Sequence, residues 1–128
     1  MVNKYYVPHI DEFHIGFEYE FKEEGDVWVE KNLKQISDLN KERIRVKYLD
    51  VDDIVSLGFD LFGETKELKV FRTIVNEKYN PEIVELTLRY EGDFPVISVF
   101  QSMEAVIVDI TCLNKSELKW LLRRTRII

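Results

Sequence analysis

Cysteine, proline and glycine are scarce in this sequence. Its 128 residues include one cysteine, Cys112, so no internal disulfide can form and nothing points to an oxidising compartment. The five glycines and three prolines are scattered, and we find no linker, repeat or low-complexity tract. We therefore predict one α+β domain over residues 1–128.

Long apolar runs are also missing. No stretch approaches the roughly 18 residues that a membrane-spanning helix needs. No apolar stretch follows Lys4, as a signal peptide would require. We expect a cytoplasmic protein without a membrane partner.

Acidic residues outnumber basic ones, and the net charge is −6. Residues 1–60 hold 14 acids and 8 bases, whereas residues 61–128 hold 10 of each. The whole excess lies in the first half of the chain. Because nucleic-acid binders usually carry a basic patch, this balance disfavours nucleic acid as a partner.

Alternating apolar and polar residues predict most of the strands. The clearest case runs from Phe13 to Phe21, and Val27–Val29 begins a partner strand that would complete a hairpin. The nearly continuous apolar run Val106–Ile110 indicates a central strand covered on both faces. Further strands are predicted at residues 43–48, 67–75, 82–90, 95–101 and 104–111.

Two helices are predicted from their capping residues. A short helix spans about 51–57, with Asp50 as its N-cap and Gly58 as its stop. A C-terminal helix spans about 115–125, with Asn114 as its N-cap and Glu117 three residues later. The fold class is therefore α+β, with a mostly antiparallel sheet of six to seven strands and these two helices.

Histidine, carboxylate and lysine side chains near the N-terminus suggest two candidate sites, a metal site and a nuclease-like site. His14, Glu18 and Glu20 would share the polar face of the first long strand, where they could line a metal site. We favour a solvated strand face, because one face of an antiparallel sheet is commonly exposed. Asp11, Glu20 and Lys22 loosely resemble the acid-and-lysine core of one nuclease group, but Glu-x-Lys occurs four times in this chain.

Other candidate groups have structural explanations. Asp50, Asp52 and Asp53 lack the spacing of a calcium loop, and helix capping accounts for them. Cys112 has no histidine near it in sequence and is expected to be a structural thiol. We predict no catalytic residue, no metal and no cofactor.

Basic residues form two candidate binding surfaces. Arg43, Arg45 and Lys47 would share one face of a strand, where they could hold phosphates. The C-terminal helix has one acid, Glu117, and five bases, which either complement the helix dipole or form a contact surface for an acidic partner. Trp120 either widens the core face of this helix, which we favour, or anchors a partner. The predicted partner-contact residues are Trp120, Arg123, Arg124 and Arg126.

Three blocks of the chain resemble a recurrent family of small proteins from phages and prophages of gut bacteria. These are residues 14–20, 44–59 and 114–122. The resemblance implies a phage accessory or virion-associated protein that acts in a bacterial cytoplasm. We know of no activity assigned to that family, so it implies no residue role.

The leading hypothesis is a non-enzymatic binding or protein-interaction domain, either with an unknown protein partner or with a second copy as a homodimer. It rests on complete strand patterns, intact helix caps and the lack of a catalytic constellation. The alternatives are sequestration of a small signalling molecule such as a nucleotide, and a metal-dependent nuclease.

Overall fold

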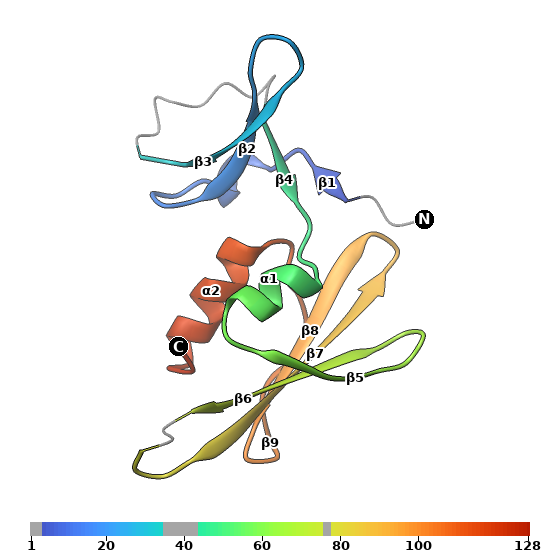
Figure 1. The fold of residues 1–128 in the computed structure, drawn as a ribbon, viewed down its shortest axis with the longest axis vertical. Helices are drawn as coiled ribbons and strands as arrows, with labels where there is room; N and C mark the ends of the chain where they lie inside the picture. Colours follow the sequence, from blue (N-terminus) through green and yellow to red (C-terminus); the bar gives the residue numbers. More distant parts are fainter. Residues whose placement is uncertain (1–3, 35–43, 76–77) are drawn as a thin grey trace. The chain divides into compact units, whose positions relative to one another are not determined.

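A computed structural model describes residues 4–34, 44–75 and 78–128 of the chain. The chain divides into two compact units, Met1–Tyr48 and Leu49–Ile128 (Figure 1). The single-domain organisation stays a prediction.

The N-terminal unit is a small antiparallel sheet in the order β1-β4-β2-β3. A 3₁₀ turn at Ile10–Glu12 lies between β1 and β2. The strands are β1 (Tyr5–Tyr6), β2 (Glu18–Lys22), β3 (Trp28–Asn32) and β4 (Ile44–Lys47). The predicted hairpin is confirmed, since β2 and β3 pair from Glu18 opposite Asn32 to Lys22 opposite Trp28.

One face of this sheet carries the unit's core. Phe17, Tyr19, Leu33, Ile44 and Val46 are buried together. The strand predicted from Phe13 begins only at Glu18, because Gly16 has a φ of 90° and the chain turns there. As a result, Ile15 is exposed instead of lying on the apolar face.

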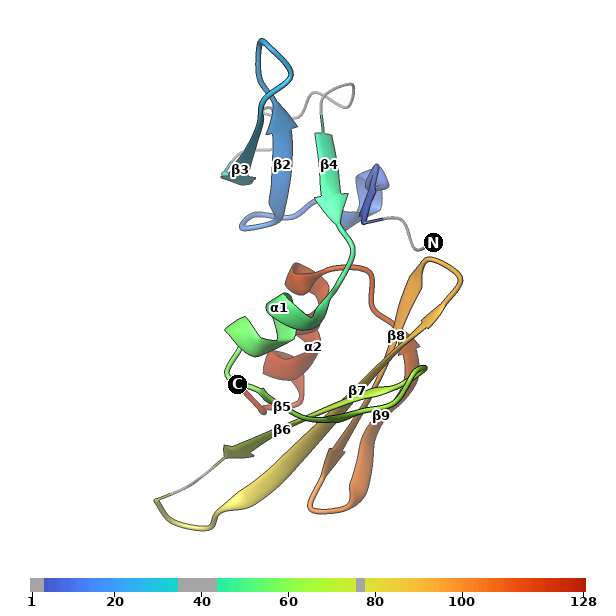
Figure 2. The same ribbon diagram turned by 45° about the vertical axis from the view of Figure 1, so that its right-hand side comes forward.

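The C-terminal unit is a five-stranded antiparallel sheet in the order β5-β6-β7-β8-β9, with two helices on one face (Figure 2). The strands are β5 (Asp60–Glu64), β6 (Lys69–Val75), β7 (Glu82–Glu91), β8 (Phe94–Gln101) and β9 (Glu104–Thr111). The helices are α1 (Val51–Ser56) and α2 (Lys115–Arg124). Ile54 of α1 and Leu118 and Leu122 of α2 are fully buried in one cluster with residues of β6, β7 and β8.

Both helices begin where their caps predict. The Asp53 N–H donates to Asp50 Oδ1 at 3.0 Å, and the Asp50 N–H donates to Asp53 Oδ2 at 3.3 Å, which completes the capping box of α1. The Glu117 N–H donates to Asn114 Oδ1 at 2.9 Å at the start of α2. These bonds satisfy backbone donors that a helix N-terminus otherwise leaves unpaired.

The predicted sheet needs correction in its strand number and arrangement. The described residues form nine strands in two sheets rather than six or seven in one. Two strands were missed, β1 because it has only two residues, and β5 because a register shift between Leu61 and Gly63 interrupts its alternation. The prediction that Val106–Ile110 is a central strand is wrong, because β9 lies at the sheet edge and its Val106, Val108 and Ile110 are exposed.

Both edges of the five-stranded sheet are irregular. The pairing of β9 with β8 shifts register twice. One shift lies between Ile107 and Ile110, and Asp109 within it has a φ of 47°. The Asp109 N–H donates to Ser98 Oγ at 2.9 Å, and Arg89 Nη2 donates to Asp109 Oδ1 at 3.4 Å, so the bulge is held by its neighbours. Bulges at sheet edges obstruct pairing with another strand. The fold therefore protects its edges without a second copy.

Among the described helices, neither has the length and hydropathy that crossing a membrane requires.

Candidate functional site

The outer face of α2 is the strongest candidate for a binding surface. Leu118 and Leu122 turn toward the core, which leaves Trp120, Arg123 and Arg124 on the opposite side. Trp120 is 54% exposed, so the favoured prediction that it widens the core is wrong. The Arg124 guanidinium lies 5.2 Å from the centre of the Trp120 ring, within cation–π range. We call Trp120, Arg123, Arg124 and Arg126 the α2 surface.

The backbone closes the end of α2 through an unusual residue. Arg126 has a φ of 63°, in the left-handed region that favours glycine. Its N–H donates to the Arg123 carbonyl at 3.0 Å, and the Ile127 N–H donates to the Leu122 carbonyl at 2.8 Å. This is a Schellman ending with arginine where glycine is usual. Arginine is strained in this conformation, at a cost on the order of 1 kcal/mol.

In the part of the chain that the structure describes, the arginines of the α2 surface have no acidic partner within ion-pair distance. Within residues 4–34, 44–75 and 78–128, no ion pair includes Arg123, Arg124 or Arg126. Backbone N–H groups, together with the Thr125 hydroxyl, already satisfy carbonyls of the last turn. The helix end therefore does not need these guanidinium groups as hydrogen-bond caps, although they still complement its dipole.

The second basic candidate lies on β4, where the guanidinium of Arg45 already contacts other side chains of the N-terminal unit. The Arg45 guanidinium lies 3.7 Å from the Tyr5 ring centre and 4.0 Å from the Trp28 ring centre. Its Nη2 also lies 3.3 Å from Glu20 Oε1, so a carboxylate balances its charge. Arg43 lies outside the described residues. This arrangement stabilises the N-terminal sheet and gives the phosphate hypothesis no support.

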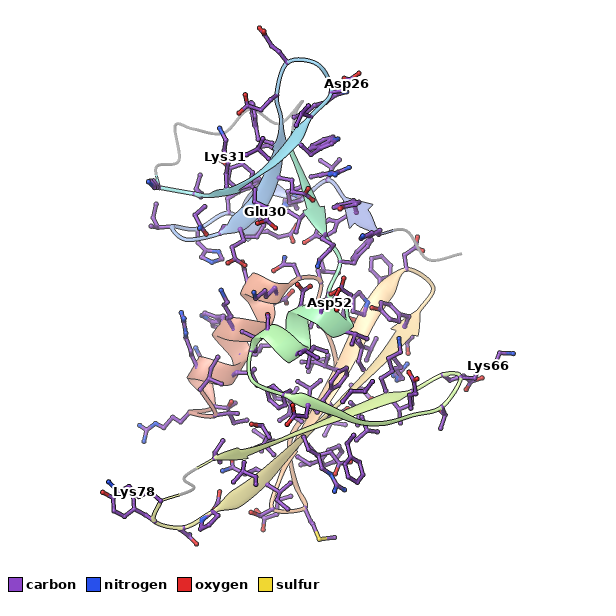
Figure 3. The ribbon with its side chains drawn as sticks, viewed as in Figure 1. Asp26, Glu30, Lys31, Asp52, Lys66 and Lys78 are labelled. Carbon is purple, nitrogen blue, oxygen red and sulfur yellow. The ribbon has the colours of Figure 1, made fainter. Side chains whose placement is uncertain are left out.

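The nuclease candidates each have a different partner. Glu20 pairs with Arg45, and Lys22 Nζ lies 2.9 Å from Asp26 Oδ1. Asp26 lies at the turn of the β2–β3 hairpin (Figure 3). Asp11 Oδ2 lies 3.3 Å from His9 Nδ1. These contacts do not show Asp11, Glu20 and Lys22 converging on a common point, and they do not support the nuclease hypothesis.

A metal site on the first strand is also unsupported. His14 precedes β2 instead of sharing its polar face with Glu18 and Glu20, and its Nδ1 lies 3.0 Å from the Glu12 carbonyl. No group of three or more histidine, cysteine, aspartate or glutamate side chains could hold a metal ion within the described part of the chain.

Two further features are structural. Burial raises the pKa of the Cys112 thiol above its ordinary value, and Glu117 raises that pKa further, so the thiol is a poor nucleophile. An open depression on the β2–β3 hairpin is lined by Tyr19, Phe21, Lys31, Asn32 and Lys34. Its Lys31 ammonium lies 4.8 Å from the Phe21 ring centre, a contact within the sheet itself.

The structure also changes how the acidic excess is distributed. The unit Met1–Tyr48 holds 10 acids and 8 bases, a net charge of −2, so the unit Leu49–Ile128 carries −4. Asp50, Asp52, Asp53 and Asp60 belong to the second unit. The first half of the chain is thus not a separate acidic body.

Comparison with known proteins gives no assignment. No family model matches the chain, and neither a curated protein nor a solved structure matches it. The resemblance to phage and prophage proteins stays a prediction.

Proposed function

We propose that this protein is a non-enzymatic interaction domain whose α2 surface binds an acidic segment of a partner protein. The observation that carries the proposal is the exposed Trp120 beside arginines that no acid of the described chain neutralises. Tryptophan and arginine are the residues most enriched where binding energy concentrates in protein interfaces.

Charge complementarity selects the chemistry of the partner. Residues 115–126 carry five bases and one acid, whereas the whole chain has a net charge of −6. A uniformly anionic polymer is repelled by most of this molecule but attracted by α2, so a short acidic segment with an apolar contact for Trp120 fits better than a nucleic acid. The resemblance to phage proteins supports a phage accessory or virion-associated role in a bacterial cytoplasm.

We predict that the Trp28→Phe variant, whose one remaining tryptophan is Trp120, binds a short peptide of glutamates flanking a leucine. Binding should change the fluorescence of Trp120, since a leucine packed on the indole alters its solvent exposure. Raising the salt concentration from about 50 mM to about 500 mM should weaken binding several-fold, because exposed charge pairs are screened.

The control peptide has the same leucine flanked by lysines, and the control variant is Trp28→Phe with Arg123→Gln and Arg124→Gln. The lysine peptide should not change the fluorescence of Trp120 in the Trp28→Phe variant. The glutamate peptide should not change it in the variant that lacks both arginines. Equal responses to the two peptides, or an unchanged affinity in the arginine variant, would remove the α2 surface as the binding site.

A further inference from the structure

The β2–β3 hairpin ends in an exposed, acidic turn. Its three acids, Glu23, Glu24 and Asp26, lie within four residues of one another, and Val27 follows them directly. All four side chains are exposed, and Val27 is 57% exposed although it is apolar. Figure 3 shows Asp26 at this turn. We call residues 23–27, which contain three acids and no base, the hairpin tip.

The backbone holds the hairpin tip in a defined shape. The Glu23 N–H donates to the Val27 carbonyl at 2.7 Å, which closes a loop of three residues. Within this loop Gly25 and Asp26 have φ angles of 81° and 62°, and both residue types are common in the left-handed region. A segment whose shape is already fixed loses less conformational entropy on binding than a flexible peptide does.

Two lysines only partly balance the acids of the hairpin tip. Lys22 Nζ lies 2.9 Å from Asp26 Oδ1, and Lys31 Nζ lies 3.7 Å from Glu23 Oε1. The Asp26 and Glu23 side chains remain 84% and 49% exposed, and such exposed pairs contribute little. In the parts of the chain that the structure describes, no ion pair includes Glu24. The tip therefore stays negative.

The hairpin tip has the chemistry that the α2 surface requires. It presents carboxylates beside an exposed valine, as an acidic segment with an apolar contact for Trp120 would. Other acidic segments of the chain fit less well. Asp50 and Asp53 already bond the backbone in the capping box of α1. The segment 64–69 interleaves its two acids with two lysines.

Each of these two surfaces lies at the end of its own unit that is remote from the connection at residues 48–49. β4 runs antiparallel to β2, so its last residue, Lys47, lies near the start of β2, whereas the hairpin tip follows the end of β2. In the other unit the Leu49 N–H donates to the Leu113 carbonyl at 2.8 Å, just before α2 begins. Residues 123–126 lie at the opposite end of that helix.

We propose that the acidic partner of the α2 surface is the hairpin tip of a second copy, so that the chain self-associates head to tail. This inference rests on the proposed function, because it names the partner of the same site. The carboxylates of the tip meet guanidinium groups, which form the stronger, charge-assisted class of hydrogen bond, and Val27 packs on Trp120. The contact joins two different surfaces, and each copy carries one of each.

The test neutralises each surface separately. The tip variant carries Glu23→Gln, Glu24→Gln and Asp26→Asn, and the α2 variant carries Arg123→Gln and Arg124→Gln. Between about 20 µM and about 1 mM, the mass of the wild-type chain in sedimentation should rise above 15.3 kDa, as expected for a weak contact. Each variant alone should self-associate at least tenfold more weakly. An equimolar mixture should associate, because each variant keeps the surface that the other lacks.

The control removes three exposed acids from other places. A variant with Glu64→Gln, Glu67→Gln and Glu104→Gln loses the same charge as the tip variant, and it should associate at least as strongly as the wild-type chain. Salt raised from about 50 mM to about 500 mM should weaken the wild-type association several-fold. Circular dichroism checks that each variant folds. If the tip variant does not fold, Glu24→Gln with Val27→Ser replaces it, with an expected loss of about threefold.

Three results would each overturn this inference: a wild-type monomer at about 1 mM, a tip variant that associates as the wild-type chain does, or a mixture that stays monomeric. The glutamate peptide tests the proposed function independently when it is titrated into the tip variant that also carries Trp28→Phe. Peptide binding with a monomeric wild-type chain would remove the second copy and keep the α2 surface as a site for acidic segments. Failure of both measurements would remove the proposed function as well.

Discussion

Leu86→Ala is expected to lower the free energy of unfolding by about 3–4 kcal/mol. Leu86 lies in the middle of β7, the central strand of the larger sheet, and it is fully buried. Its register partners Phe71 and Val99 are also fully buried, so the cavity left by alanine has little room to collapse. Urea or guanidinium unfolding followed by circular dichroism measures the change.

The matched control removes the same atoms from an exposed position. Leu61 on β5 is 44% exposed, and Leu61→Ala should cost less than about 1 kcal/mol. Equal losses in Leu61→Ala and Leu86→Ala would contradict the placement of the core between the sheet and the two helices.

Phe17→Ala is expected to destabilise the N-terminal unit by about 3–4 kcal/mol. Phe17 is almost completely buried, and the Phe13 ring packs edge-on against it at 5.1 Å between ring centres. Trp28 lies in this unit and Trp120 in the other, so a Trp120→Phe background leaves a fluorescence reporter for the N-terminal unit alone. The midpoint of the unfolding curve reported by Trp28 should fall.

Ile15→Ala is the control for this unit, since Ile15 is an exposed apolar residue only two positions away. An unchanged Trp28 midpoint in Phe17→Ala would contradict the core assignment. The same Phe17→Ala change in the Trp28→Phe background also tests the predicted single domain. One cooperative domain requires the Trp120 curve to shift equally.

Regular local patterns predict the elements of this fold well. The alternation of apolar residues identifies β7 almost to its ends, because one row of its side chains is buried against the helices. The caps Asp50 and Asn114 locate both helices, because a side chain that bonds a backbone N–H three residues later acts within its own segment.

Long-range arrangement is beyond the reach of those patterns. The apolar run Val106–Ile110 indicates burial on both faces, yet β9 is an edge strand whose bulges disturb the alternation. Composition likewise reveals no boundary near Tyr48, where the chain divides into two units with separate cores. Strand order and the division of the core depend on contacts between distant segments.

The candidate site likewise has features that local sequence patterns predict and features that they do not. The basic residues of the C-terminal helix and the position of Trp120 off the leucine stripe can be read from the sequence. The exposure of Trp120 cannot, since its distance from the leucine stripe also fits a wider core face. The left-handed backbone conformation of Arg126 cannot be predicted from the sequence either, because glycine, the residue that usually indicates it, is absent.

The substitution Arg126→Gly tests most directly the central claim that the α2 surface binds an acidic partner. Glycine relieves the left-handed strain, so the free energy of unfolding should rise by about 0.5–1 kcal/mol. The same change removes one guanidinium from the α2 surface, so affinity for the glutamate peptide should fall about two- to five-fold. Both quantities are measured in the Trp28→Phe background, by urea unfolding and by titration. Higher stability with weaker binding is the predicted result, and higher stability with unchanged or tighter binding would contradict the account.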